Sequence, residues 1–384
     1  MGITHDKTVP VQTRSERPTS FAVADFAAVT GREAEWKYTP VGELQALFND
    51  ALVTAKPSVS MEPVAGIETT FIARSDARLG SVYAPEDRAA AQSYTAAEAL
   101  LIKITGDDAK EAVIRLSDYG TAAAAGLIFV DVAPQAHATV VLIQEGAAEL
   151  TETVEIKVGD GANLTLVAIG EWDDDAVHVS AHHAELGRDA KLKHIAVNMS
   201  GKVVRVNPSA HLTHKGGDVE MYGLYFADPG QHLEHQVWIN HVAPNCRSRV
   251  NYKGALQGRG SHTVWIGDVL IGPEAVGTDS YEENRNLVLG TGPIADSVPN
   301  LEIECGDIEG AGHASATGRF DEEHLFYLMA RGIDELTARR LVVHGFLNEI
   351  VQQIDNEEIA AELAERLSAE LARSDAAIIA GMER

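Results

Sequence analysis

The fold of this chain is decided by a pattern that is clearest at residues 159–170, which read GDGANLTLVAIG. A polar turn containing glycine leads directly into a run of apolar and β-branched residues. Similar segments are GRDAKLKHI at 187–195, GGDVEMYGL at 216–224 and GRGSHTVWI at 258–266. A turn and a strand that recur at a loose spacing of this kind are typical of a solenoid, in which each coil packs only on its neighbours.

The surrounding region, residues 101–317, has the same character. Short apolar runs such as TVVLI (139–143), TVEIKV (153–158) and HQVWINH (235–241) are separated by Gly, Asn and Asp, and no long helical period interrupts them. Many short strands with polar turns predict an all-β architecture. We therefore expect a β-helix core over 101–317, with a β-sandwich as the alternative.

The N-terminal part of the chain predicts a different structure. Residues 1–20 have the composition of a flexible lead-in. Residues 21–100 are expected to be partly helical, because apolar residues recur there at three- and four-residue spacings. Thr39 is placed to cap one such helix and Pro40 suits its first turn. The alanine-rich segment at 85–101 is compatible with either a helix or a connector.

Residues 318–384 predict a helical C-terminal region. Asp321 is a good N-cap, Gly332 is placed to end the first helix, and a second helix follows over 334–354. A third begins at Asn356 and carries an apolar residue at every fourth position: Ile359, Leu363, Leu367 and Leu371. Such a stripe either packs inside the molecule, which we favour, or receives a partner.

Composition excludes several classes of function. The net charge of −26 argues against nucleic acid as a partner, because phosphate binding depends on Lys and Arg. No apolar run reaches 18 residues and the N-terminus lacks a secretory signal, so we expect a cytoplasmic protein without a membrane span. Cys246 and Cys305 are then expected to remain thiols rather than form a disulfide.

The 15 histidines are the residues most suggestive of a metal site. They cluster at 178–183, 211–214 and 232–241, but residues three apart on a strand point to opposite faces. His178 and His182 can share a face, yet no nearby carboxylate in the sequence completes a site. Histidines in turns and on exposed faces are the simpler interpretation. Neither a serine nucleophile motif nor a phosphate-binding loop is present, which favours a scaffold over an enzyme.

Three segments together resemble the SufB/SufD family of the Suf iron–sulfur cluster assembly machinery. They are GREAEWKYTPVGEL at 31–44, the region 232–290 containing HVAPNCRSRVNYKG and GTDSYEENRNLVLG, and PNLEIECGDIEGAGHASATGRFDEEHLFYLMARGI at 299–333. The segment WKYT at 36–39 and a length that is short for SufB favour the SufD branch. A SufB-like paralogue and a β-helix carbohydrate-active enzyme are the alternatives.

The resemblance implies a right-handed parallel β-helix flanked by helical segments, without enzymatic activity of its own. It implies pairing with a SufB-like subunit and docking of a SufC-like ABC ATPase on the C-terminal helices, a region that includes Phe326, Leu336 and Leu347. It also implies a transient iron–sulfur cluster near the SufB interface rather than a tightly bound cofactor. A homodimer is a further possibility.

The family signature before the C-terminal helices directs attention to His313. In that signature a histidine is implicated in cluster formation at the interface, and His313 aligns with it, so His313 is the expected metal ligand. The signature also has a cysteine two residues earlier, where this chain has Ala311. Cys305 is the nearest thiol and the second candidate residue for the cluster-assembly interface, although a small buried apolar side chain is the simpler interpretation of it.

Overall fold

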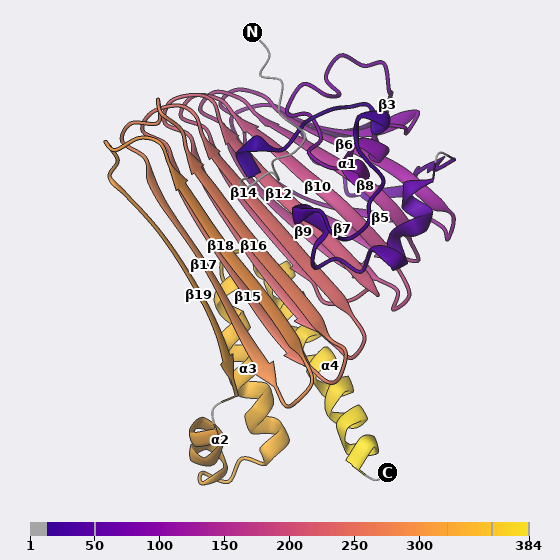
Figure 1. Cartoon of the computed structure of the whole chain (residues 1–384), viewed down its shortest axis with the longest axis vertical. Helices are drawn as coiled ribbons and strands as arrows, with labels where there is room; N and C mark the ends of the chain where they lie inside the picture. Colours follow the sequence, from indigo (N-terminus) through magenta and orange to yellow (C-terminus); the bar gives the residue numbers. More distant parts are fainter. Residues whose placement is uncertain (1–13, 50, 321, 355, 383–384) are drawn as a thin grey trace.

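The computed structural model describes residues 14–49, 51–320, 322–354 and 356–382. Its main body is a β-solenoid in which each coil gives one strand to each of two sheets (Figure 1). Neighbouring coils pair in parallel, whereas β3 and β2 close the N-terminal end by pairing antiparallel with β4 and β5. The predicted β-helix class is confirmed, and its coils run from residue 98 to residue 319 rather than from 101 to 317.

The even-numbered strands make up most of the first sheet, sheet A, and the odd-numbered strands most of the second, sheet B. Sheet A contains β1 (Val53–Thr54), β3 (Ile67–Ala73), β4 (Glu98–Ile104), β6 (Ala123–Val132), β8 (Glu149–Val158), β10 (Val177–Leu186), β12 (Val203–Leu212), β14 (His232–His241), β16 (His262–Ile271) and β18 (Ile294–Ile303). Sheet B contains β2 (Ser58–Met61), β5 (Ala109–Ser117), β7 (His137–Gly146), β9 (Asn163–Trp172), β11 (Lys191–Asn198), β13 (Asp218–Ala227), β15 (Arg247–Gln257), β17 (Asp279–Leu289) and β19 (Gly310–Arg319).

The repeated turns of the sequence form a stack along one side of the solenoid. At this corner Gly161, Asp189, Gly216 and Asn245 all have positive φ angles, between 55° and 79°. The backbone N–H of each donates to a carbonyl oxygen in the following coil, as from Gly161 to Arg188. Glycine, Asn and Asp tolerate this backbone conformation best, which explains why the turns resemble one another. The turn at 258–261 differs, because it leads into β16 of sheet A.

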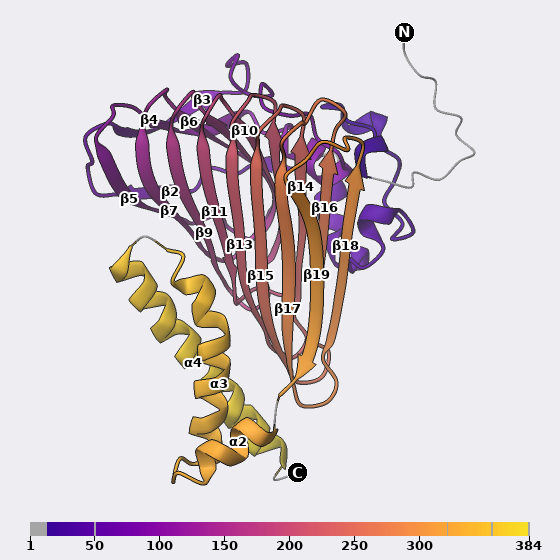
Figure 2. The same cartoon turned by 90° about the vertical axis from the view of Figure 1, so that its left-hand side faces the viewer.

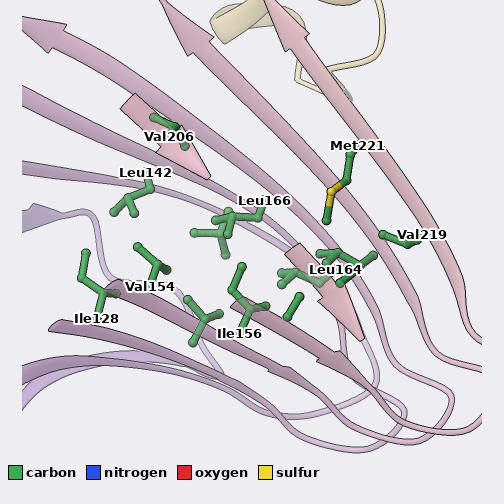
Figure 3. Close-up of a cluster of buried hydrophobic side chains, with 14 of the residues drawn as sticks. Ile128, Leu142, Val154, Ile156, Leu164, Leu166, Val206, Val219 and Met221 are labelled. Carbon is green, nitrogen blue, oxygen red and sulfur yellow. The ribbon is translucent and has the colours of Figure 1, made fainter. Parts of the chain in front are cut away.

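The hydrophobic core lies between the two sheets. Alternate residues of each strand point inward, so that Leu164 and Leu166 of β9 face Val154 and Ile156 of β8 (Figure 3). Coil length varies along the solenoid and is greatest near its C-terminal end: paired residues of neighbouring coils are 26 positions apart at Val177 and Val203, and 32 apart at His262 and Ile294. This change in coil length accounts for the loose repeat in the sequence.

The N-terminal segment covers the outer face of sheet A. It contains the short helix α1 (Arg88–Ser93) and four 3₁₀ segments, η1 (Arg14–Glu16), η2 (Val23–Asp25), η3 (Ala34–Trp36) and η4 (Val41–Phe48). Two expectations are corrected here. Residues 14–20 belong to the packed structure, since Arg14 is buried against Glu86, whereas residues 1–13 lie outside the described part. Thr39 does not cap η4, because its hydroxyl donates to Glu234 instead.

The C-terminal helices are α2 (Glu322–Met329), α3 (Glu335–Val351) and α4 (Glu357–Met382), and α3 and α4 lie along the outer face of sheet B (Figure 2). Asn356 caps α4 by accepting from the backbone N–H of Ile359, and Gly332 follows α2 with a φ of +87°. The stripe from Ile359 to Leu371 is buried with sheet B residues in one cluster, which confirms intramolecular packing. Asp321, predicted to cap the first helix, lies outside the described residues.

None of the helices, so far as the chain is described, has the length and apolar character needed to cross a membrane.

Candidate functional site at the open end of the solenoid

The solenoid ends at β18 and β19, the last strands of the two sheets. Within the described residues neither strand has a further neighbour on its outer edge, so both present unpaired backbone groups. Ile294 and Ile303, at the two ends of β18, are 55% and 47% exposed. Natural proteins usually protect such edges, and an apolar edge left open is suited to pairing with another chain.

His313 lies on β19 at this open end. It stands in register with Glu282 of β17, and its Nδ1 is 3.9 Å from the Glu282 Oε1. The His313 side chain is 42% exposed, whereas that of Glu282 is only 1% exposed. Neither carboxylate oxygen of Glu282 has a hydrogen-bond partner. Burial, together with the nearby charge of Asp268, raises the pKa of Glu282 to about 8.

A cavity of about 510 Å³ opens beside His313. Its walls include Arg14 and Lys37 from the N-terminal segment and Trp238 and Asn300 from sheet A. Two motifs that lie far apart in the sequence, the one around Trp36 and the one around His313, therefore border the same space.

The N-terminal motif is anchored by buried polar contacts on sheet A. The Trp36 ring lies under the guanidinium group of Arg205, with 3.9 Å from Cζ to the ring centroid. Thr39 donates to Glu234, and Arg205 donates to the same carboxylate. Burial alone would raise the pKa of Glu234, but the hydrogen bond from His232 and the charge of Arg205 hold that pKa at about 2. These contacts fix the segment that carries Lys37 at the cavity.

Cys305 follows β18 and is 7% exposed within the main hydrophobic cluster. Its Sγ lies 3.9 Å from the backbone oxygen of Asp307. A buried, apolar surrounding suits a structural side chain better than a reactive thiolate. Ala311 is partly buried against the same cluster, so the position of the family cysteine here contributes packing and no ligand.

Most of the clustered histidines are buried on strands, which corrects the expectation of turns and exposed faces. His182 of β10 and His194 of β11 meet across the interior, with 2.8 Å between Nδ1 and Nε2. Burial lowers the pKa of His194 to about 4 and that of His235 to about 3. His178 does have a carboxylate neighbour, Glu152 of the preceding coil, at 3.7 Å. Within the described ranges, however, no three or more His, Cys, Asp or Glu side chains are grouped to hold a metal ion.

Comparison with known proteins identifies the family. Residues 115–346 match the SufBD core domain of the SUF system for FeS cluster assembly. A protein of Mycobacterium leprae named as an iron–sulfur cluster assembly SufBD family protein is 45% identical over 363 residues, covering 92% of this chain and 93% of its own length. The chain belongs to the SufBD family.

Two further relatives show how far the likeness extends. A SufBD family protein of Mycobacterium tuberculosis is 44% identical over 381 residues, 96% of this chain and 94% of its own. The iron–sulfur cluster assembly protein SufD of Escherichia coli is 25% identical over 216 residues, which cover 56% of this chain and 51% of that protein. The relatives are thus named for iron–sulfur cluster assembly, and the segment of this chain that carries His313 lies on β19 at the open end.

The predicted ATPase-docking residues differ in their accessibility. Phe326 of α2 is 74% exposed, and Tyr327 and Met329 on the same helix are also exposed. Leu336 is partly buried, whereas Leu347 is fully buried between α3 and sheet B. Leu347 is therefore not available for direct contact with a partner in this structure, because it packs on the sheet.

Glu282 is the site residue that sequence reasoning missed. It lies in SYEENRN, where Ser280, Glu282, Asn284 and Asn286 alternate on the inward face of β17. The available signal was that polar residues occupy every second position of this strand, on the side that faces the core. Such buried polar side chains indicate a site rather than simple packing.

Proposed function

We propose that this chain is a SufD-type scaffold subunit that pairs with a SufB-like subunit through the open end of its solenoid. A SufC-like ABC ATPase would dock on the C-terminal helices, and the complex would assemble clusters in the cytoplasm. The chain would do no catalysis by itself. A nascent iron–sulfur cluster would be held transiently as cargo near His313.

The observation that carries this function is the open end itself. The unpaired edges of β18 and β19 can continue their sheets into a second chain, and the exposed apolar side chains at the edge add contact area. His313 lies at this edge and is accessible, so a partner seated there would meet its imidazole. The N-terminal end of the solenoid finishes differently: β2 and β3 are the outermost strands there, but they pair antiparallel with β5 and β4 and so do not continue the parallel coils.

Support for the ATPase contact comes from α2. Phe326, Tyr327 and Met329 form an exposed apolar group on one short helix, beyond the region where α3 and α4 pack on sheet B. Aromatic residues and Met are enriched at protein–protein contacts. This surface lies on α2, past the end of β19, whereas the open end is formed by the outer edges of β18 and β19, so the two partners would contact different elements (Figure 2).

Co-expression with SufB-like and SufC-like subunits tests the proposal. We expect a stoichiometric complex that contains all three chains, measured by native mass spectrometry after size-exclusion chromatography. Ile303→Lys, which places a charge at the open end, should remove the SufB-like subunit. Val53→Lys is the matched control, because Val53 is 50% exposed on β1 near the other end of the solenoid.

Two results would contradict the proposal. One is the absence of any complex with the SufB-like subunit. The other is a complex that Ile303→Lys and Val53→Lys weaken equally. If two copies of this chain associate through the open end in place of a SufB-like partner, a homodimer replaces the proposed pairing.

A further inference from the structure

Glu282 is an unusual residue for the interior of a solenoid. Glu282 pairs with Val250 on one neighbouring strand, β15, and with His313 on the other, β19. Val250 is apolar and only 2% exposed. Neither oxygen of the Glu282 carboxylate has a hydrogen-bond partner. A buried polar group without a partner costs about 1–3 kcal/mol of stability, so the native chain carries this group at a cost.

The surroundings of Glu282 leave space for its carboxylate group. Gly267 of β16 lies directly across the interior, where a Cβ atom would come within 2.4 Å of the Glu282 Oε2. The Trp265 ring forms the adjacent wall, and its Nε1 also lacks a partner. Asp268, the nearest other acid, is already engaged with Arg14 and Asn300. His313 is therefore the polar side chain with which the Glu282 carboxylate can interact.

We propose that His313 and Glu282 together hold a ferrous ion at the open end, with Glu282 as the second ligand. An imidazole and a carboxylate are ligands that suit Fe²⁺. Two donor atoms bound to one ion at about 2.1 Å lie about 3 Å apart when they occupy adjacent positions. The present separation of 3.9 Å requires a movement of about 1 Å. His313 has the freedom to make it, because it is exposed on an edge strand.

The choice of iron as the ion rests on the proposed function. Ala311 removes the thiolate that would favour a sulfur-rich site, so the pair suits an iron ion taken up as cargo before sulfide arrives. Two protein ligands leave the other positions on the ion to water and to groups of a SufB-like partner.

An anaerobic titration of the isolated chain with Fe²⁺ tests this inference, with Co²⁺ as an optical and paramagnetic probe. We expect one saturable site, together with broadening of the His313 imidazole resonances by Co²⁺. Glu282→Gln and His313→Ala should each weaken binding more than about tenfold. Glu282→Met keeps the length of the side chain and removes its unsatisfied oxygens. It should fold at least as well as the wild type and still lose the ion.

Glu283→Gln is the matched control, because Glu283 is on the opposite face of the same strand and pairs with Arg285. Its affinity for the ion should equal that of the wild type. The inference is overturned if the wild-type chain shows no saturable binding into the millimolar range. It is also overturned if Glu282→Gln and Glu282→Met bind as the wild type does. Because the titration uses the chain alone, iron binding can be absent while the complex with SufB-like and SufC-like subunits still forms. Iron binding can equally be present when no complex forms, so failure of this inference is distinguishable from failure of the proposed function.

Discussion

Gly254→Ala should destabilise the protein, because two tyrosine rings in the interior fit over glycines of the neighbouring coil. Gly254 of β15 pairs with Tyr225 of β13, and Tyr252 of β15 pairs with Gly223 of β13. A Cβ atom at Gly254 would lie only 1.8 Å from the Tyr225 Cε2. Both rings are completely buried, so neither has space into which it can move.

The size of the effect follows from the overlap. Non-bonded carbon atoms prefer a separation of about 3.5–4.0 Å, so the Tyr225 ring has to leave its position. Overpacking of this kind costs about 3 kcal/mol. The Tyr225 hydroxyl, which donates to Asn286 at 2.6 Å, loses that hydrogen bond for about 1 kcal/mol more. An unfolding entropy of about 2.1 cal/mol/K per residue converts the total of about 4 kcal/mol into a decrease in Tm of about 5 °C.

Thermal unfolding followed by circular dichroism measures this decrease. Gly318→Ala is the control, since no atom lies within 4 Å of its Cβ position, and its free energy of unfolding should change by less than about 0.5 kcal/mol. In a Tyr225→Ala background, Gly254→Ala should have almost no further effect, because the clashing ring is gone. A wild-type-like Tm for Gly254→Ala, or equal costs with and without the ring, would refute the packing described here.

Two further predictions concern acid stability and the ATPase surface. Burial lowers the pKa of His235 to about 3, whereas an unfolded histidine titrates near 6.5. As the pH falls below 6.5, His235 is therefore protonated in the unfolded chain but remains neutral in the folded one. The free energy of unfolding of the wild type, relative to that of His235→Gln, should decrease by about 3 kcal/mol between pH 6.5 and pH 4. Urea denaturation at each pH measures this difference. A pH-independent difference would argue against a neutral buried His235. Phe326→Ala should leave the Tm unchanged while weakening association with the SufC-like ATPase in a pull-down from purified subunits, and undiminished binding would remove Phe326 from that surface.

The solenoid could be predicted because its signal is local and repeated. Each turn with a glycine or an Asp at positive φ, such as Gly161 and Asp189, directly precedes a strand with apolar residues at alternate positions. The N-terminal region was harder to predict. Its strands β1–β3 and the short helix α1 form because they pair with or pack on the coils, and such long-range contacts leave little trace in local spacing.

For the site, the sequence located His313 but not its surroundings. The alternation of side chains along a strand correctly placed His178 and His182 on the same face of β10. It did not show which face of the strand points to the interior of the solenoid. His211 is outward-facing and still buried, because Tyr83 of the N-terminal segment stacks on it at 3.7 Å. The Glu282–His313 pair depends on the register between β17 and β19, which are separated by the whole of β18 and its turns.

The central claim, that the open end is where this chain takes part in cluster assembly, is tested most directly by cluster yield in cells that depend on the complex. The measurement is the iron and acid-labile sulfide recovered with the purified complex that contains His313→Ala, compared with the wild type. We expect the subunits to co-purify in unchanged proportion and the bound iron and sulfide to fall sharply. An unchanged content of iron and sulfide in an intact complex would contradict the claim.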